Sequence, residues 1–429
     1  MTEPLVASQP SPRYRWAVLV MISLAMFGNY YVYDSVAPIA DMLKSNLGFS
    51  DENIGQLYSV YSIAAVLVLL IGGIVIDRFG TVKSTIFFAA VCTVASVLMA
   101  VTSDLRVMLA SRFLLGLGSE PLIVAITTAL AKWFKGRELS FAFGLNLTIA
   151  RLGSVTADWS PTWARFAYES WHGPLVVAAV IGALCLISAL GYGALEKIAA
   201  RRYGLGKAGQ TDKFVLSDLF RFNTSFWFVV ALCVTFYSAI FPFRSFSIKF
   251  FIEAWELTRQ TAGQFNSVLP LAAMFATPLF GLLVDKIGKR ALFMMAGSFL
   301  LMPVYLMMAY QVPPLLGVPI AMMGIAFSMI PAIMWPSVAY IVEERRLGTA
   351  YAVMTLVQQI GVAAMNWLIG RTNDAFGASA ANPAGYVPMM WIFSILGFLA
   401  LTFAILLRRQ ETGPHAHGLE TITAGASKS

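Results

Sequence analysis

The chain has 429 residues, of which 58% are hydrophobic and only 12% are charged. A soluble protein of this length needs far more polar surface than these residues supply, so the composition excludes a soluble fold. The formal net charge of +8 is compatible with nucleic-acid binding, but basic residues in so apolar a chain set membrane orientation first, and no nucleic-acid partner is expected.

Twelve apolar segments, each long enough to cross about 30 Å of hydrocarbon, predict an all-α polytopic protein with the lipid bilayer as its surroundings. The predicted spans are residues 16–39, 54–76, 84–102, 106–131, 138–160, 173–195, 225–251, 262–284, 290–310, 314–342, 348–370 and 386–408. Of the 30 Lys and Arg residues, 21 fall in the segments on the side that holds both termini. This excess predicts that both termini are cytoplasmic.

The spans divide into two bundles of six helices. The predicted parts are a cytoplasmic segment 1–15, an N-terminal bundle 16–195, a cytoplasmic linker 196–224, a C-terminal bundle 225–410 and a cytoplasmic tail 411–429. The linker is polar and lacks apolar periodicity. We predict a disordered tail, which explains His415 and His417 better than metal binding does.

A short motif, Gly-x-x-x-Asp-(Arg/Lys)-x-Gly, ends the second span at residues 73–80 and the eighth span at residues 281–288. The two copies are 208 residues apart (281 − 73), and the same offset connects Gly116 with Gly324. A constant offset over this distance predicts two halves built on one repeated plan.

Two ionisable residues, Glu120 and Arg151, lie near the centres of the fourth and fifth spans. A charge at such a depth costs a few kcal/mol and usually faces a cavity or a partner. A zwitterionic dipeptide, about 7 Å long, could place its ammonium group on Glu120 and its carboxylate on Arg151. The alternative is a structural salt bridge between the two residues that binds nothing. The repeat offset equates Glu120 with Ser328 and Arg151 with Gln359, so neither charge recurs, as expected of a site that orients an asymmetric substrate.

The first span carries Tyr30, Tyr33 and Asp34 in its outer half. Asp34 follows Tyr30 by one helical turn, so the two residues share a face. Asp34 either attracts a cationic side chain of the substrate or forms a latch at the outer mouth with Arg244 of the seventh span. The sequence leaves both readings open.

Three further side chains are weaker candidates for substrate contact. Asn146 and Gln359 offer neutral hydrogen-bonding groups, and Trp335 offers an aromatic wall. Packing between helices is the commoner reason for such residues in a membrane span.

The twelve spans, the two halves, the central linker and the repeated motif together resemble the major facilitator superfamily. Several stretches in both halves are similar to its lysosomal dipeptide uniporter branch. They are residues 28–34, 112–120, 133–139, 150–154, 241–243, 281–289 and 347–351. The resemblance implies a carrier for dipeptides, notably cationic ones, in which Glu120 and Arg151 match the positions that hold the peptide ends. Tyr33 and Asp34 match a Tyr-Asp pair of the branch.

The resemblance also assigns a gating role to charged residues at the cytoplasmic rim, Asp77, Arg78, Asp285 and Lys286, which in the superfamily clamp the two bundles together. We expect Asp77 to accept hydrogen bonds from a basic residue such as Arg137. The alternative is that these residues only signal topology.

An acidic dileucine signal is absent before the first span, where the chain reads Glu3-Pro-Leu-Val. This favours the cell (inner) membrane, or the lysosomal membrane if the protein is eukaryotic, and leaves any accessory subunit open.

Three functions are compatible with the sequence. The preferred one is an alternating-access dipeptide uniporter that favours cationic dipeptides. The alternatives are a proton-coupled carrier of amino acids or organic anions and a membrane sensor that no longer transports. No nucleophile–base pair or metal constellation appears, so neither enzyme activity nor a cofactor is expected.

Overall fold

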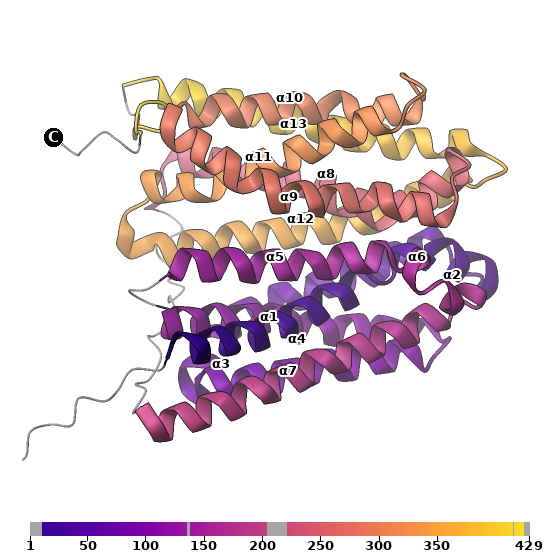
Figure 1. The fold of residues 1–429 in the computed structure, drawn as a ribbon. Coiled ribbons are helices and arrows are strands. Elements are labelled where there is room, and N and C mark those ends of the chain that lie inside the picture. Colours follow the sequence, from indigo (N-terminus) through magenta and orange to yellow (C-terminus); the bar gives the residue numbers. More distant parts are fainter. Residues whose placement is uncertain (1–10, 135–137, 204–220, 415, 424–429) are drawn as a thin grey trace, which may run out of the picture.

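The structure is a computed structural model that describes residues 11–134, 138–203, 221–414 and 416–423. Its helices form two halves that lie against one another, α1–α7 and α8–α13 (Figure 1). Helix α1 begins and helix α13 ends at the same end of the molecule, which we call the proximal end. The opposite, distal end carries the short helices α2 and α6.

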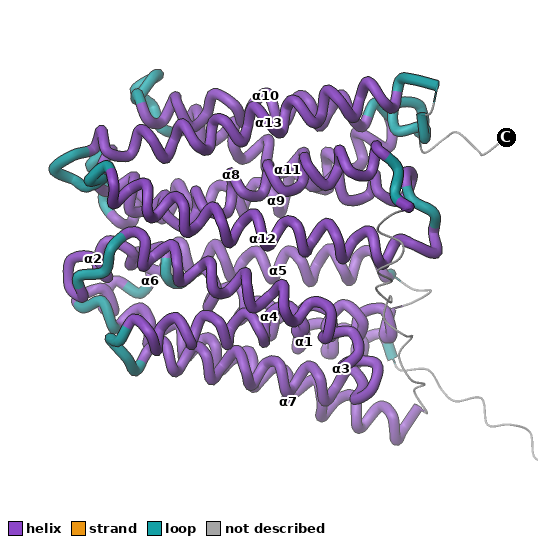
Figure 2. Tube along the Cα trace, turned by 180° about the vertical axis from the view of Figure 1, so that it is seen from behind, coloured by secondary structure: helices purple, strands orange, loops and turns teal. Residues whose placement is uncertain are grey.

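The N-terminal half is built from long helices and short distal pieces. These are α1 (Pro12–Asp34), η1 (Ala37–Ile39), α2 (Ala40–Leu47), α3 (Asp51–Ala100), α4 (Leu105–Phe134), α5 (Leu139–Asp158), α6 (Ser160–Trp163), η2 (Arg165–Glu169) and α7 (Gly173–Tyr203). Seen from the opposite side in Figure 2, α5 lies next to the C-terminal half. Helix α3 packs on α12 of that half.

The C-terminal half has the same plan. Its elements are α8 (Thr224–Ala254), α9 (Arg259–Ile287), α10 (Arg290–Ala309), α11 (Gly317–Ile341), η4 (Glu344–Arg346), α12 (Leu347–Ala375), η5 (Pro383–Tyr386) and α13 (Val387–Glu411). Helices α9 and α12 face the N-terminal half (Figures 1 and 2).

Ten helices within the described ranges are long and apolar enough to cross a membrane. The remaining two predicted spans are α5, with 20 residues, and the first part of α3. Helix α3 holds the predicted second and third spans in one run of 50 residues. That length corresponds to about 75 Å, far more than one bilayer crossing, so the helix must reverse within it. The second and third spans are therefore connected by a kink within α3 and not by a loop. The predicted pair of six-span halves is confirmed.

The kink lies at the last glycine of the repeated motif. Gly80 has φ 81° and ψ 165°, and its counterpart Gly288, 208 residues later (288 − 80), has φ 73° at the end of α9. Side chains disfavour positive φ, whereas glycine adopts it without a steric cost. The motif therefore ends in glycine because both halves reverse direction there.

The two halves are in closest contact at the distal end. A methyl group on Gly55 of α3 would overlap the carbonyl oxygen of Asn366 of α12, and one on Gly263 of α9 would overlap that of Asp158 of α5. Glycine at these positions allows the backbones of opposite halves to touch.

The tail after α13 is folded against the proximal end, so the prediction of a disordered tail is wrong for its described part. The Glu420 carboxylate accepts hydrogen bonds from the backbone N–H groups of Ala291 (2.8 Å) and Leu292 (3.3 Å). Arg290 donates to the carbonyl oxygen of Ile422 at 2.6 Å. The tail thus satisfies N–H groups that the first turn of α10 leaves without an intrahelical partner.

One of the two tail histidines has a structural role. The Nδ1 atom of His417 lies 2.8 Å from Glu411 Oε1, and its Nε2 atom lies 2.9 Å from the Asn223 amide nitrogen. His415 lies outside the described residues. These hydrogen bonds give His417 a structural role in the ordered part of the tail.

We expect Glu420→Ala to release the tail, because the substitution removes the carboxylate cap of α10, a contribution of about 1 kcal/mol. Limited proteolysis of the full chain in detergent should show faster cleavage after residue 411. Glu344→Ala, at an exposed position of the same end, is the matched control. Equal cleavage of the two variants would contradict the capping role.

Candidate substrate site

A cavity of about 250 Å³ lies between the two halves. We call it the central cavity. The predicted residues that line it are Tyr30, Tyr33, Asp34, Glu120, Arg151, Arg244, Trp335 and Gln359. Further polar residues in its wall, which were not predicted, are Asn29, Tyr61, Ser119, Ser154, Tyr237 and Thr355, and Gln358 also lies in the wall. Every predicted substrate-binding residue except Asn146 is thus in the lining.

Glu120, on α4, is held by neutral groups from both halves. The Tyr61 hydroxyl and the Gln359 amide nitrogen each donate to Glu120 Oε1 at 3.2 Å. Gln359 is the repeat counterpart of Arg151, so the C-terminal half supplies an amide where the N-terminal half supplies a guanidinium. Within the described part of the chain, Glu120 forms no ion pair with Arg151. The alternative of a salt bridge between these two residues is not seen here.

Arg151, on α5, is held between aromatic rings of both halves. Its guanidinium carbon lies 5.9 Å from the Tyr30 ring centroid and 5.6 Å from that of Phe327. Such cation–π contacts orient the side chain without using its N–H donors. Among the described residues the guanidinium has no hydrogen bond or ion pair, so its donors are available to an anionic ligand.

The aromatic wall of the cavity is cross-linked by its own contacts. Trp335 Nε1 donates to the Tyr237 hydroxyl at 3.0 Å, and Tyr237 stacks on Phe241 with ring centroids 5.3 Å apart. In the N-terminal half, Tyr33 and Tyr61 meet edge to face at 4.7 Å. These contacts fix the rings in place before any ligand arrives.

Arg112, a buried residue of α4, holds the end of α1 that carries Tyr33 of the cavity wall. It is 2% exposed and donates to the carbonyl oxygen of Tyr33 at 3.1 Å, with its guanidinium carbon 4.9 Å from the Tyr58 ring centroid. A cation at the last turn of α1 satisfies a free carbonyl there. Arg112 is therefore a positioning residue.

Asn146 does not line the central cavity. Its amide nitrogen donates to the Ser23 hydroxyl at 3.0 Å, and the residue is 4% exposed. The hydrogen bond joins α5 to α1, which is the packing role that such a residue commonly has. We therefore leave Asn146 out of the proposed site.

The distal wall of the cavity is a buried charge network that joins the halves. Arg244 of α8 lies 3.6 Å from Asp34 and 3.0 Å from Asp158. The Asn266 amide of α9 donates to the second oxygen of Asp158 at 2.7 Å. We call Asp34, Asp158, Arg244 and Asn266 the distal latch. The Asp34–Arg244 latch is one of the two interpretations that the sequence left open, whereas Asp158 and Asn266 were not predicted.

Two further ion pairs connect the halves at the distal end. Lys249 of α8 lies 3.0 Å from Asp51 of α3, and both side chains are fully buried. Arg259 of α9 donates to both carboxylate oxygens of Asp41, at 2.5 and 2.6 Å. Buried and bidentate pairs of this kind hold two surfaces in one register. The distal end of the cavity is therefore closed.

The predicted gating residues of the repeated motif lie at the proximal end. Asp285 pairs with Arg290 at 2.9 Å, a contact within the C-terminal half and not between halves. Asp77, Arg78 and Lys286 are exposed. Arg137, the predicted partner of Asp77, lies outside the described residues.

Two helical halves of one plan, with a polar cavity between them that is closed at one end, define the architecture of a membrane carrier. The chain belongs to the Major Facilitator Superfamily, whose family model matches residues 22–363 and 228–428.

Among curated relatives, the chain is 33% identical over 380 residues to the lysosomal dipeptide transporter MFSD1 of Danio rerio, covering 85% of this chain and 82% of the relative. It is 32% identical to the protein of the same name from Homo sapiens, covering 85% of this chain and 81% of the relative. The chain is therefore a multi-pass membrane transporter with a small-molecule substrate, and not an enzyme.

Solved structures share the fold at low sequence identity. A bacterial homologue of the human lysosomal transporter Spinster, in an inward-facing and occupied conformation, aligns with a TM-score of 0.75 and 16% identity, covering 93% of this chain and 98% of that one. The nucleoside transporter NupG aligns with a TM-score of 0.72 and 14% identity, covering 91% and 98%.

Proposed function

We propose that the protein is a dipeptide uniporter that holds the substrate's ammonium group on Glu120 and its carboxylate on Arg151. The observation that carries this proposal is that the two opposite charges share one cavity without pairing with each other. Such a pair of side chains can bind a zwitterionic ligand whose charged ends are about 7 Å apart. The name of the relatives, dipeptide transporters, points to the same class of ligand.

Each end of the dipeptide would make charge-assisted contacts. Glu120 accepts from an ammonium, and Arg151 donates two N–H groups to a carboxylate, each worth about 1.5–3 kcal/mol. Tyr61 and Gln359 donate to Glu120 and thereby fix the carboxylate in the position that receives the ammonium.

A cationic side chain fits the remaining lining. Tyr30, Tyr61, Tyr237 and Trp335 present aromatic rings to the central cavity. Aromatic faces attract a desolvated cation by roughly 2 kcal/mol. The preference for cationic dipeptides is part of this proposal, and Asp34 acts in it as a latch residue because Arg244 already neutralises it.

Transport would proceed by alternating access, with the halves rocking about the central cavity. In this structure the distal latch is closed, so the substrate would exchange through the proximal end. We propose that the proximal end is cytoplasmic, in agreement with the distribution of Lys and Arg. The membrane would be a cell membrane or, as in the relatives' name, a lysosomal one.

A thermal-shift comparison of free and capped dipeptides tests the two-ended site. We expect Lys-Ala to raise the apparent melting temperature of the detergent-solubilised protein, because a ligand that binds only the folded state stabilises it. N-acetyl-Lys-Ala and Lys-Ala-amide should each give a much smaller shift. Equal shifts from all three peptides would exclude the proposed role of the two ends.

Proton coupling is the second candidate mechanism. Glu120 accepts hydrogen bonds from the neutral groups of Tyr61 and Gln359, and no cation of the described residues pairs with it. Its carboxylate could therefore bind and release a proton during the transport cycle. Uptake of Lys-Ala into proteoliposomes with and without an imposed pH gradient separates the two mechanisms. Uptake that ignores the gradient supports the uniporter, and uptake that follows it and fails in Glu120→Gln supports the coupled carrier.

A further inference from the structure

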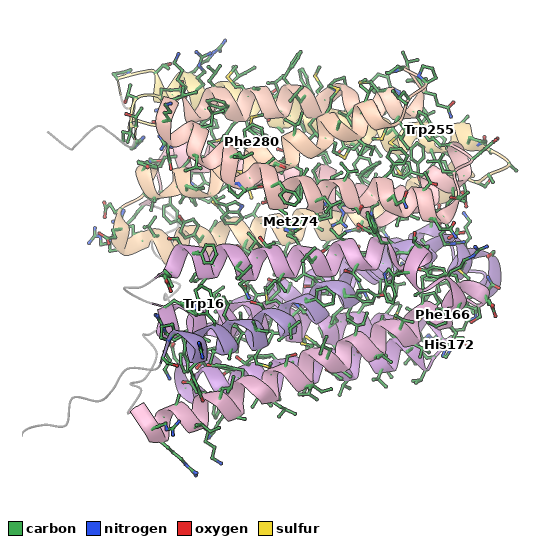
Figure 3. The ribbon with its side chains drawn as sticks, viewed as in Figure 1. Trp16, Phe166, His172, Trp255, Met274 and Phe280 are labelled. Atoms are coloured by element: carbon green, nitrogen blue, oxygen red, sulfur yellow. The ribbon has the colours of Figure 1, made fainter. Side chains whose placement is uncertain are left out.

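A second cavity, of about 290 Å³, lies beside the central cavity, between α5, α9 and α11. Arg151, Tyr237 and Trp335 line both cavities. The rest of its wall is largely apolar and includes Ala273, Met274, Phe327 and Pro331. We call this second cavity the apolar chamber; Met274, labelled in Figure 3, marks the part of its wall on α9.

We propose that the apolar chamber receives the side chain of the dipeptide's second residue and so makes the transporter selective for residue order. The proposal rests on the proposed function, in which the carboxylate binds Arg151. The second residue carries that carboxylate on its own α-carbon, so its side chain starts within two bonds of the group that Arg151 holds. Arg151 stands at the boundary of the two cavities, and the apolar chamber is thus the space next to that side chain.

The two cavities differ in chemistry. The central cavity contains the carboxylate of Glu120 and the Asp34–Arg244 ion pair, together with hydroxyl and amide groups. Apart from Arg151, the apolar chamber is lined by uncharged residues. A first residue with a cationic side chain is therefore favoured in the central cavity, whereas a second residue with an apolar side chain is favoured in the apolar chamber.

The size of the apolar chamber is sufficient for a large side chain. An apolar cavity of about 150 Å³ admits benzene, and the chamber is larger, at about 290 Å³. An aliphatic or aromatic side chain that enters it leaves water for an apolar wall. Differences of one or a few carbon atoms in such a pocket change affinity by roughly tenfold or more.

Gly144 on α5 provides a way to fill the chamber. It lines the apolar chamber, and a Cβ atom added there meets no heavy atom within 4 Å. Leucine at this position therefore has room, and its side chain would take space from the ligand. Gly317 at the start of α11 also has open space around an added Cβ atom but belongs to neither cavity, so Gly317→Leu is the matched control.

The test measures inhibition of labelled Lys-Ala uptake by unlabelled dipeptides in proteoliposomes of the full chain. In the unmodified protein we expect Lys-Leu to inhibit at roughly tenfold lower concentration than Leu-Lys. Unlabelled Lys-Leu should also inhibit at a lower concentration than unlabelled Lys-Ala. In Gly144→Leu, inhibition by Lys-Leu should weaken more than inhibition by Lys-Ala, so that the advantage of Lys-Leu disappears, and Gly317→Leu should behave as the unmodified protein.

Equal inhibition by Lys-Leu and Leu-Lys would overturn the order preference even if Lys-Ala is transported, and the proposed function would then stand alone. If a folded Gly144→Leu variant lost inhibition by every dipeptide to the same extent, the chamber would be part of the transport pathway or a lipid site, and not a pocket for the second side chain. Absence of any dipeptide uptake would remove the proposed function and this inference together. The peptide-order comparison needs no variant, so it decides the question even where Gly144→Leu fails to fold.

Discussion

Arg151→Gln is expected to weaken binding of a free dipeptide by roughly tenfold to a hundredfold, because it removes the charged donor for the substrate carboxylate. Charge-assisted hydrogen bonds contribute about 1.5–3 kcal/mol, and about 1.4 kcal/mol corresponds to a factor of ten in Kd. Arg151→Lys should recover part of the affinity, since lysine keeps the charge but loses the planar pair of donors. Isothermal titration of Lys-Ala in detergent, with uptake measured in parallel, checks both variants.

Capped peptides distinguish substrate binding from a structural role of Arg151. Lys-Ala-amide has no carboxylate, so Arg151→Gln should change its affinity little, whereas N-acetyl-Lys-Ala should lose affinity as the free dipeptide does. Glu120→Gln should show the reverse pattern. Arg106→Gln, at an exposed arginine of α4, controls for the loss of a positive charge. A similar loss for both capped peptides in Arg151→Gln would assign Arg151 to the architecture and not to the substrate.

The fold could be predicted because its signals are properties of single segments. Apolar runs of membrane length identify the spans, and the 208-residue offset identifies two equivalent halves. Glu120 and Arg151 were visible for the same reason, since a charge in the middle of an apolar run has no water to solvate it. The structure then brings these two residues to one cavity, as the antiparallel order of α4 and α5 suggests.

Two distal charges, Asp158 and Lys249, escaped prediction because they lie near the ends of their spans. Asp158 ends α5 and Lys249 lies near the end of α8, yet both side chains are fully buried. A charge near a span end ordinarily reaches interfacial water. Here it does not, because the opposite half covers it, and the contact between halves is not encoded in either segment alone.

The ordered tail and the apolar chamber could not be predicted from the sequence for the same reason. The tail is short and polar, and its order comes from the free N–H groups of α10, which Glu420 satisfies. The apolar chamber is lined by residues of α5 and α9, which come from opposite halves and touch at Gly263. Both features depend on pairs of elements that are far apart in the sequence.

Arg244→Met is expected to destabilise the closed distal end strongly, since it leaves Asp34 and Asp158 buried without a cation. Breaking a buried pair by removing one partner typically costs about 3–5 kcal/mol. We expect a clear fall in the apparent melting temperature.

We also expect the cavity to open from the distal side in this variant. Ser154→Cys, in the cavity wall, reports this opening, because the three native cysteines are buried. A membrane-impermeant maleimide applied from the distal side should label it in Arg244→Met and not in the parent.

Neutralising the whole network should reverse much of that loss. In the triple variant Arg244→Met, Asp34→Asn, Asp158→Asn, the melting temperature should recover, because replacing every member of a buried ionic group is often close to neutral. The Ser154→Cys labelling should nevertheless stay high, since the contacts between halves would be weaker. Arg165→Met, at an exposed distal arginine, is the control and should change neither measurement. Parent-like stability and labelling in Arg244→Met would mean that Lys249 and Arg259 close the distal end without the latch, and the carboxylate of Asp34 would then be free to act on the substrate.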